Sequence, residues 1–327
     1  MAYDRRRNAP EDVFQGRDVD NFINSAISAF FRLTPPQQIA VVIVLLIIGV
    51  GVAIYVQRHQ ANSVPALDGN ALLGNPSGAG TDSDNYLMVK PYFTLSYNNS
   101  HGTPNWVSWR VTESDLGSAP RKQVFDSDET LPVGSNIIRT SDYSGGGFDR
   151  GHMCPHSDRG ANQEMSYATF VMTNVIPQAP NVNQKAWAQL EMYCRDLVKQ
   201  HNRLYVMSGP IGQGGTGSKG YKEFLAGSRV TVPAECWKVI VVVPEDGTPE
   251  SAVSITAGER VIAVDMPNDQ TQVGEAWDIY RCRPSAIEQK TGLHFFTAVQ
   301  PAVASALEQK LDDESIPEPR PMTHSHD

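Results

Sequence analysis

An uncharged, strongly apolar run near the N-terminus is the feature that most limits how this chain can fold. Residues 39–56 read IAVVIVLLIIGVGVAIYV, and no charged residue occurs between Arg32 and Arg58. A helix of this length spans about 27 Å, close to the hydrocarbon thickness of a bilayer of about 30 Å. We therefore expect a single transmembrane helix at 39–56. A buried core helix and a cleaved signal peptide are the alternatives, but 38 residues precede the run and no A-x-A cleavage pattern follows it.

The basic residues around this segment predict its orientation. Only Arg58 follows it before Lys90, whereas five arginines precede it: Arg5, Arg6, Arg7, Arg17 and Arg32. Because loops rich in Lys and Arg stay in the cytoplasm, residues 1–38 are expected to form a cytoplasmic arm. The rest of the chain is then expected on the periplasmic or extracellular side.

Composition divides the exported part into three segments. Residues 57–85 are rich in Ala, Asn, Gly, Ser and Asp and predict a flexible tether. Residues 86–311 are the only segment able to build a core, and residues 312–327 (DDESIPEPRPMTHSHD) predict a disordered tail. The chain carries 27 Lys+Arg and 36 Asp+Glu, which argues against a protein that coats nucleic acid through bulk positive charge. Within 86–311 the net charge is only −3, from 20 basic and 23 acidic residues, and an enzyme that grips phosphate locally stays open.

The pattern of residues 86–311 favours an α+β domain over a doubly wound sheet, because strands and helices do not alternate regularly. Apolar and β-branched runs predict strands at Asn105–Thr112, Leu204–Met207, Cys236–Val243 and Arg260–Asp265. Apolar residues at helical spacing predict helices at Gln184–Gln200, at Ser285–Lys290 before Gly292, and at Ala302–Leu311.

The sharpest local motif is Asp149-Arg150-Gly151-His152, which follows three consecutive glycines, Gly145 to Gly147. Histidine can take a proton from water near neutral pH, and arginine can hold a phosphate oxygen in a fixed fork. A structural histidine beside a paired arginine explains these four residues equally well.

A second group of polar residues occurs on the predicted helix Gln184–Gln200 and just before it. Asn183, Glu191 and Arg195 fall within an arc of about 120°, at the edge of the apolar stripe. An amide oxygen can ligate Mg²⁺, a carboxylate can hold its waters, and a guanidinium can bind phosphate. The plain alternative makes Asn183 a helix N-cap and Glu191 with Arg195 an exposed ion pair.

Together these motifs resemble the DNA/RNA non-specific endonuclease family of the ββα-metal fold, over about residues 86–298. The ordered set carries the resemblance: Asp149 to His152, Asn174 with Pro177-Gln178, and the spacing of Asn183, Glu191 and Arg195. Arg121, followed by Phe125 and Asp128, fits an upstream arginine of the family. Trp237-Lys238-Val239 and Thr291-Gly292 with Phe295-Phe296 are similar to later landmarks.

The resemblance implies a ββα-metal (His-Me finger) nuclease domain with a central mixed or antiparallel sheet. It implies His152 as the general base and one Mg²⁺, with Mn²⁺ as a substitute, held directly by Asn183 and through water by Glu191. Arg121, Arg150 and Arg195 are implied to bind phosphate and support catalysis, with Asn174 also at the substrate. The expected activity is hydrolysis of DNA and RNA with little sequence preference, leaving 5′-phosphate ends.

Other functions stay open on the sequence. A catalytically silent relative could bind nucleic acid or a protein at the membrane, although His152, Asn183 and Glu191 are all present. A phosphodiesterase acting on another substrate is the third hypothesis. The sequence leaves open the biological role, a preference for DNA or RNA, a homodimer, and any inhibitor protein.

Cysteine and glycine patterns give three further expectations. Among Cys154, Cys194, Cys236 and Cys282, a Cys236–Cys282 disulfide is the preferred pair, while Cys194 fits a core thiol. A zinc site at His152, Cys154 and His156 is disfavoured because no fourth ligand follows nearby. Residues 209–220 (GPIGQGGTGSKG) lack the Gly-Lys-Ser/Thr ending of a phosphate-binding loop and predict a flexible hairpin connection.

Overall fold

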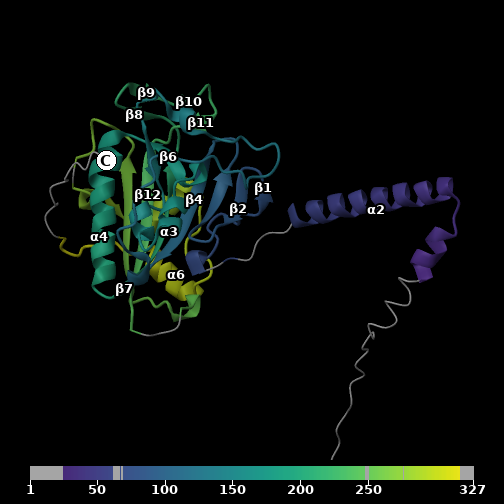
Figure 1. Cartoon of the computed structure of the whole chain (residues 1–327). Coiled ribbons are helices and arrows are strands. Elements are labelled where there is room, and N and C mark those ends of the chain that lie inside the picture. The colour runs from purple at the N-terminus through teal and green to yellow at the C-terminus, as the bar shows by residue number, and fades with distance from the viewer. Residues whose placement is uncertain (1–24, 62–66, 68, 247–249, 275, 317–327) are drawn as a thin grey trace, which may run out of the picture. The chain divides into compact units, whose positions relative to one another are not determined.

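The computed structural model describes residues 25–61, 67, 69–246, 250–274 and 276–316, which belong to two compact units, Met1–Asn62 and Ser63–Asp327. In the first unit, residues 25–31 are helical and helix α2 covers Pro35–Ala61 (Figure 1). The apolar side chains of Leu45, Leu46 and Ile47 in α2 are exposed. Within the described residues, none of the helices combines the length and the apolar character that crossing a membrane requires.

The second unit is built on an eight-stranded sheet in which every neighbouring pair is antiparallel, in the order β1-β2-β3-β4-β7-β12-β13-β14. The predicted mixed or antiparallel sheet is therefore antiparallel. Its strands are β1 (Thr81–Asp82), β2 (Asn85–Val89), β3 (Thr94–Asn98), β4 (Thr103–Val111), β7 (Asn202–Ile211), β12 (Glu235–Pro244), β13 (Arg260–Pro267) and β14 (Arg281–Cys282). The four predicted strands overlap β4, β7, β12 and β13.

Both faces of the central strands are buried, which explains why β12 reads as an almost unbroken apolar run. Ile240 points into a core shared with Leu190 of helix α4 (Ala188–Lys199), whereas Val239 and Val241 point into a core on the opposite face. Helices α5 (Pro284–Thr291) and α6 (Pro301–Glu308) contribute to that second core. Gly292 ends α5 with a left-handed conformation, φ 72°, which glycine adopts without strain.

Three two-stranded antiparallel sheets lie outside the large sheet. They are β5–β6 (Asp149–His152 with Val175–Gln178), β8–β9 (Gly215–Gly217 with Gly220–Lys222) and β10–β11 (Phe224–Leu225 with Val230–Thr231). The glycine-rich stretch thus forms the end of β7 and a two-stranded hairpin, as its composition predicts. Helix α3 (Gln163–Ala168) lies between β5 and β6 in the sequence.

The second unit begins earlier than the predicted limit at residue 86. Ala71, Leu73 and Ala79 are almost wholly buried, although they lie in the stretch expected to be a tether. Asn75 holds this segment in place by accepting from the backbone N–H of Ala79 and donating to its carbonyl. Small residues fit close to the sheet here, and a composition-based reading mistakes them for a linker.

The predicted start of the tail at residue 312 also needs correction. The buried Asp312 carboxylate accepts hydrogen bonds from Arg260 at 2.7 Å and from Arg281 at 3.1 Å. Ile316 packs against the core beyond it. A carboxylate shared by two arginines thus ties residues up to 316 to the sheet, while 317–327 lie outside the described residues.

The preferred Cys236–Cys282 disulfide is wrong, because all four cysteines are free thiols. Cys236 on β12 lies opposite Met266 and belongs to the core under α4. Cys282 on β14 lies opposite Ala263, packed against the core on the other face of the sheet. Side chains on a strand alternate between the two faces of the sheet. The sulfurs of Cys236 and Cys282 lie on opposite faces and therefore cannot bond to each other.

Candidate active site

The motif Asp149–His152 forms strand β5, which pairs with β6 and leads into a helix, giving a β-β-α unit. In this pairing Asp149 lies opposite Gln178 and His152 opposite Val175. A Cβ on Gly151 would lie 2.0 Å from Oε1 of Gln178, so only glycine leaves room for that side chain. After β6 the chain turns into the π-helical segment Val182–Trp187 and then α4. Segments with this wider hydrogen bonding are frequent at functional sites.

His152 is held between two aromatic rings. Its imidazole centroid lies 4.8 Å from that of Phe125 and 4.7 Å from that of Phe170, and only 8% of the residue is exposed. Its Nε2 atom is buried and has no hydrogen-bond partner among the described residues. Burial, together with the nearby charges of Arg121, His156 and Arg150, holds the pKa of His152 well below its usual range. The imidazole is therefore neutral at pH 7 and able to accept a proton.

Two arginines flank this imidazole on the same aromatic rings. The Arg121 guanidinium lies 5.3 Å from the Phe170 ring centroid, and the Arg150 guanidinium lies 5.3 Å from that of Phe125. Neither arginine forms an ion pair within the described part of the chain, and Nε of Arg150 is buried without a partner. Burial lowers the pKa of Arg121, while the charges of Glu191 and Asp149 raise it, which places these acidic groups around the same guanidinium. Two cations with unused donors thus flank a neutral base.

Asn183 is oriented by the acidic residue of the motif. Its Nδ2 donates to Oδ2 of Asp149 at 2.9 Å, and Nε2 of Gln184 donates to the same oxygen at 2.7 Å. Since the amide nitrogen is used, the Oδ1 atom of Asn183 is left to accept or to ligate. Asn183 is the second residue of the helical segment and not its N-cap, so the plain alternative for this residue does not hold.

Glu191 and Arg195 do not form the exposed pair considered above, because each has a partner on another element. Glu191 lies 3.3 Å from Nζ of Lys238, whose side chain is only 1% exposed. Arg195 lies 3.1 Å from Oδ1 of Asp158, and Trp109 donates to the other oxygen of that carboxylate at 3.0 Å. Burial raises the pKa of Glu191, and the charges of Lys238 and Arg195 offset part of this effect. Glu191 is thus a carboxylate held in position by Lys238.

Replacing Lys238 with Met should destabilise the fold by about 3–5 kcal/mol, because it leaves the Glu191 carboxylate buried without its cation. The ammonium also lies 4.3 Å from the centroid of the Trp187 ring, a contact that methionine keeps only as apolar packing. Urea unfolding measures the loss, and the double variant Lys238→Met/Glu191→Gln should recover part of it. A single variant within about 1 kcal/mol of wild type would show that the pair contributes little.

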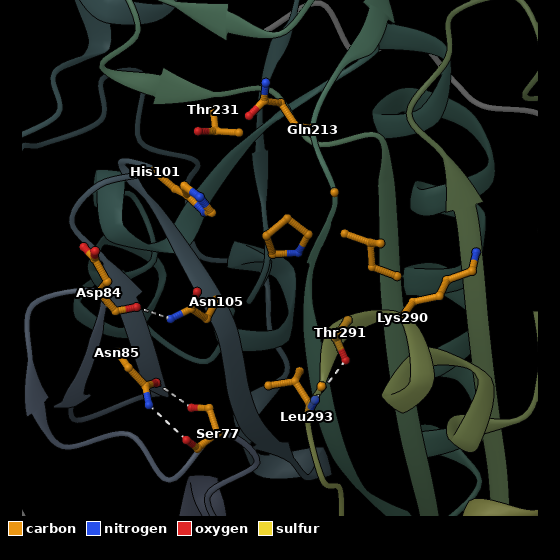
Figure 2. A pocket seen from close by; sticks show the side chains of 14 residues that line it. Ser77, Asp84, Asn85, His101, Asn105, Gln213, Thr231, Lys290, Thr291 and Leu293 are labelled. Carbon is orange, nitrogen blue, oxygen red and sulfur yellow. Dashed lines mark hydrogen bonds between the residues drawn. The ribbon is translucent and has the colours of Figure 1, made fainter.

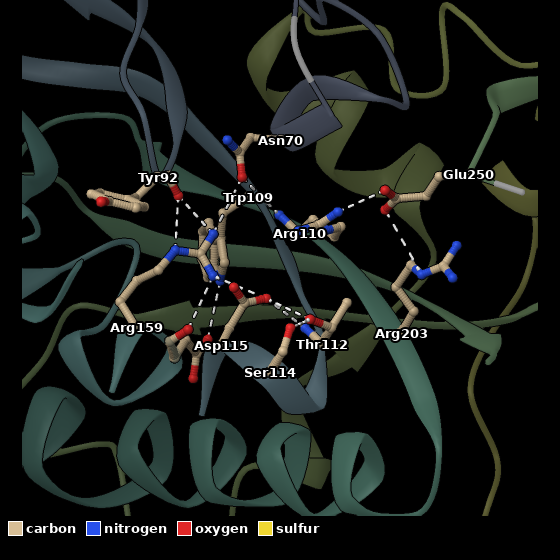
Figure 3. Close-up of polar contacts among 11 residues, drawn as sticks. Asn70, Tyr92, Trp109, Arg110, Thr112, Ser114, Asp115, Arg159, Arg203 and Glu250 are labelled. Atoms are coloured by element: carbon tan, nitrogen blue, oxygen red, sulfur yellow. Dashed lines mark hydrogen bonds and ion pairs between the residues drawn. The ribbon is translucent and has the colours of Figure 1, made fainter. Parts of the chain in front are cut away.

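The segment after His152 is locked by a buried arginine. Arg159 donates to the Tyr92 carbonyl from Nε at 2.9 Å and from Nη2 at 2.6 Å, and its Nη1 lies 3.7 Å from Asp115 (Figure 3). The neighbouring Asp158 is thereby fixed where it receives Arg195. The structure therefore gives Arg195 a held position, whereas Arg121 and Arg150 keep their donors free.

Asn174 has a structural place instead of the predicted one at the substrate. It is wholly buried, and its Nδ2 donates to the carbonyls of Cys154 and Thr169 while Oδ1 accepts from Cys154 N–H. Both of its amide hydrogens are used in joining the end of β5 to the turn before β6. The side chain is wholly buried and therefore presents no group to a nucleotide.

Several residues that shape the site carry no strong sequence signal. Phe170 holds both Arg121 and His152, and His156 lies with its ring 6.5 Å from that of His152. Burial and the charges of Arg121 and Arg195 lower the pKa of His156 to about 4, and its buried Nδ1 has no partner among the described residues. In the sequence, Phe125 and Lys238 stand out only as parts of motifs that resemble those of the family. The contacts of Phe125, Phe170 and Lys238 join segments far apart in the chain, and local patterns do not show them.

The ligands available for a metal fit a hydrated ion. The described part of the chain contains no cluster of three or more His, Cys, Asp or Glu side chains placed to hold a metal. Asn183 offers one amide oxygen, and Glu191 is the carboxylate predicted to act through water. Mg²⁺ keeps several waters and tolerates such a sparse protein shell, so these residues fit it.

A pocket of about 580 Å³ lies elsewhere, at residues such as Asp84, Asn105 and Lys290, and none of the site residues lines it (Figure 2). Its polar groups bond to one another: Asn105 donates to the Asp84 carbonyl at 2.7 Å and Ser77 donates to Asn85 at 2.6 Å. Among its described residues, this pocket brings together no base, cation pair and metal ligand of the kind found around His152.

A neutral base, two cations and an amide ligand at a β-β-α junction define a metal-assisted phosphodiester hydrolase. The sequence profile of the DNA/RNA non-specific endonuclease family matches residues 74–302, and the chain belongs to this family. It is accordingly a hydrolytic endonuclease with nucleic acid as its substrate.

Similar proteins agree with this assignment. A nuclease from Nostoc sp. is 44% identical over 252 residues, covering 76% of this chain and 88% of that protein. Human mitochondrial Endonuclease G is 30% identical over 215 residues, covering 64% of this chain and 69% of that protein. The crystal structure of an EndoG/EndoGI complex, described as showing the mechanism of EndoG inhibition, matches with a TM-score of 0.59 at 24% identity. That match covers 72% of this chain and 94% of the other, and supports the fold.

Proposed function

We propose that the chain is a membrane-anchored, Mg²⁺-dependent endonuclease that cleaves DNA and RNA with little sequence preference. The observation that carries the proposal is the neutral, buried His152 between Arg121 and Arg150, with Asn183 oriented by Asp149. These groups act on phosphate and water, which DNA and RNA share, and not on base edges.

The residues divide the reaction between them. His152 accepts a proton through Nε2 from a water whose oxygen attacks the phosphorus, and the bond to the 3′-oxygen breaks, leaving a 5′-phosphate. Arg121 and Arg150 bind the phosphate oxygens and offset the charge that builds up on them. Asn183 would hold Mg²⁺ directly and Glu191 through water. When bound, the ion supplies positive charge at the leaving oxygen.

The proposal is tested by incubating the purified full-length chain with supercoiled plasmid and with RNA, with Mg²⁺ or with EDTA. We expect both substrates to be cleaved only with the divalent ion, and the new ends to carry 5′-phosphates. Binding without cleavage would favour the catalytically silent relative, and cleavage of other phosphodiesters alone would favour the third hypothesis.

The pH dependence of the reaction follows from the environment of His152. Because its pKa lies well below the ordinary value of about 6.5, the proton-accepting form persists into mildly acidic solution. The acidic limb of kcat/KM against pH should therefore fall below pH of about 6.5. Among the nearby charges, Arg121 lowers the pKa of His152 most. Arg121→Met should therefore move this limb to higher pH, whether or not the maximal rate changes. If the acidic limb of the wild type had its midpoint at or above the ordinary histidine pKa of about 6.5, His152 would not be the base.

The membrane anchor is proposed on sequence grounds, from the uncharged run at 39–56 and the arginines before it. Residues 1–38 would then lie in the cytoplasm and the nuclease unit on the periplasmic or extracellular side. A reporter that is active only outside the cytoplasm should give signal when it is fused after residue 316. The same reporter fused before residue 39 should give none. Signal from the second fusion alone would show that the orientation is the reverse of the one proposed. Recovery of the chain in a fraction free of membranes would contradict the proposed anchor.

A further inference from the structure

The β8–β9 hairpin, Gly215–Lys222, is attached to both halves of the candidate active site. On one side, Ser218 N–H donates at 2.8 Å to the carbonyl of Gly147, two residues before Asp149. On the other side, Gln270 N–H donates at 2.7 Å to Thr216, and Oε1 of Gln270 accepts at 3.0 Å from the backbone of Asn181, two residues before Asn183. The hairpin is therefore positioned by the same segments that present Asp149 and Asn183.

Close backbone approach makes this attachment specific. A Cβ on Gly217 would lie 2.3 Å from the carbonyl oxygen of Gly147, so the two segments touch through their main chains. Gly214 has φ +95°, and a Cβ there would lie 2.0 Å from the hydroxyl oxygen of Tyr221. The Tyr221 hydroxyl therefore rests on the hairpin backbone, which holds the ring in place while 61% of the residue stays exposed.

The outer side of the hairpin is basic and aromatic. Lys219 is exposed and Lys222 is half-exposed, and the side chain of neither has a hydrogen bond or ion pair within the described ranges. Phe224, the second residue after the hairpin, is 38% exposed. The one acidic neighbour in this stretch, Glu223, accepts from Gln213 and Tyr221 at 3.4 Å each. Figure 1 shows β8 and β9 beside β10 and β11 at one end of the domain.

We propose that this hairpin binds the single-stranded nucleotides next to the scissile phosphate, with Tyr221 stacking on an unpaired base and Lys219 and Lys222 pairing with neighbouring phosphates. Aromatic rings interleaved with cations are how proteins bind single strands without reading sequence. The nuclease domain is slightly acidic overall, so attraction of a polyanion depends on local cations of this kind. The inference rests on the proposed nuclease function and adds to it a preference for unpaired segments.

The test measures binding of the full-length chain to a short fluorescein-labelled single strand by anisotropy in EDTA, so that cleavage plays no part. Tyr221→Ala should raise Kd about tenfold, whereas Tyr221→Phe keeps the ring and should bind as wild type. Lys219→Ala/Lys222→Ala should reduce the slope of log Kd against log salt by about 1.4, or 0.7 for each lost phosphate contact. Lys199→Ala, an exposed lysine at the end of α4, is the matched control and should change neither.

Three results would overturn the inference: an unchanged Kd in Tyr221→Ala, an equal loss for single strand and blunt duplex, or a lowered melting temperature that accounts for the loss. Failure of the proposed function is seen separately, as cleavage that survives in His152→Ala or never occurs in wild type. An active wild type with unaffected hairpin variants would therefore remove only the role of the hairpin.

Discussion

His152→Ala is expected to lower kcat by about 10²- to 10⁴-fold, with DNA and RNA affected alike. We propose the imidazole as the proton acceptor, and its buried Nε2 has no hydrogen-bond partner among the described residues. The variant should keep its fold, because Phe125 and Phe170 remain packed against each other with their centroids 5.1 Å apart. Initial rates on plasmid and RNA at saturating Mg²⁺ measure the loss.

His201→Ala is the matched control for this substitution. The His201 side chain is 82% exposed, at the end of α4, and its nearest charged partner is Glu113 at 3.7 Å. We expect this variant to retain full activity. Undiminished cleavage by His152→Ala, with a melting temperature like that of wild type, would remove His152 from the mechanism.

Asn183→Ala is expected to give the second largest loss, at least about 100-fold at limiting Mg²⁺. It deletes the one protein oxygen that would ligate the ion directly. Raising the Mg²⁺ concentration should restore part of the rate, since Glu191 would still hold the ion through water. Isothermal titration calorimetry with Mg²⁺ measures the change in affinity without any need for turnover.

Two neighbours of Asn183 make this experiment specific. Gln184→Ala removes the second amide bound to Asp149 but no ligand, so the Mg²⁺ dependence should stay near that of wild type. Asp149→Ala removes the acceptor that orients Asn183, and the affinity should fall about 10- to 100-fold. An Asn183→Ala enzyme with the wild-type response to Mg²⁺ would place the metal elsewhere.

Local patterns predicted the elements of the nuclease domain well. Alternation and β-branching located β4, β7, β12 and β13, since burial on a sheet imposes a period that a few residues reveal. Helical spacing also predicted that Asn183, Glu191 and Arg195 share one helix, but Asn183 lies in the π-helical segment before α4 and each of the three bonds to a different partner. The ordered motifs then indicated the family, which the profile match shows.

Contacts between residues far apart in the sequence could not be predicted from such patterns. Alternation places Lys238 inside the protein, but only the fold shows that its charge meets Glu191, 47 residues away. Asn174 was assigned to the substrate because it occurs among the family motifs, whereas its bonds all go to the backbone of its own neighbourhood. The domain limits failed because Ala71 and Asp312 occur in polar, small-residue stretches, whose burial depends on a sheet formed elsewhere.

The two outermost strands of the large sheet, β1 and β14, contain two residues each. A longer free edge would offer a row of unused N–H and C=O groups to any other extended chain. Here an incoming strand finds hardly one repeat to pair with, and Asp82 and Arg281 add charge at these edges. The sheet is therefore poorly suited to growing by recruitment of further strands at these two edge strands.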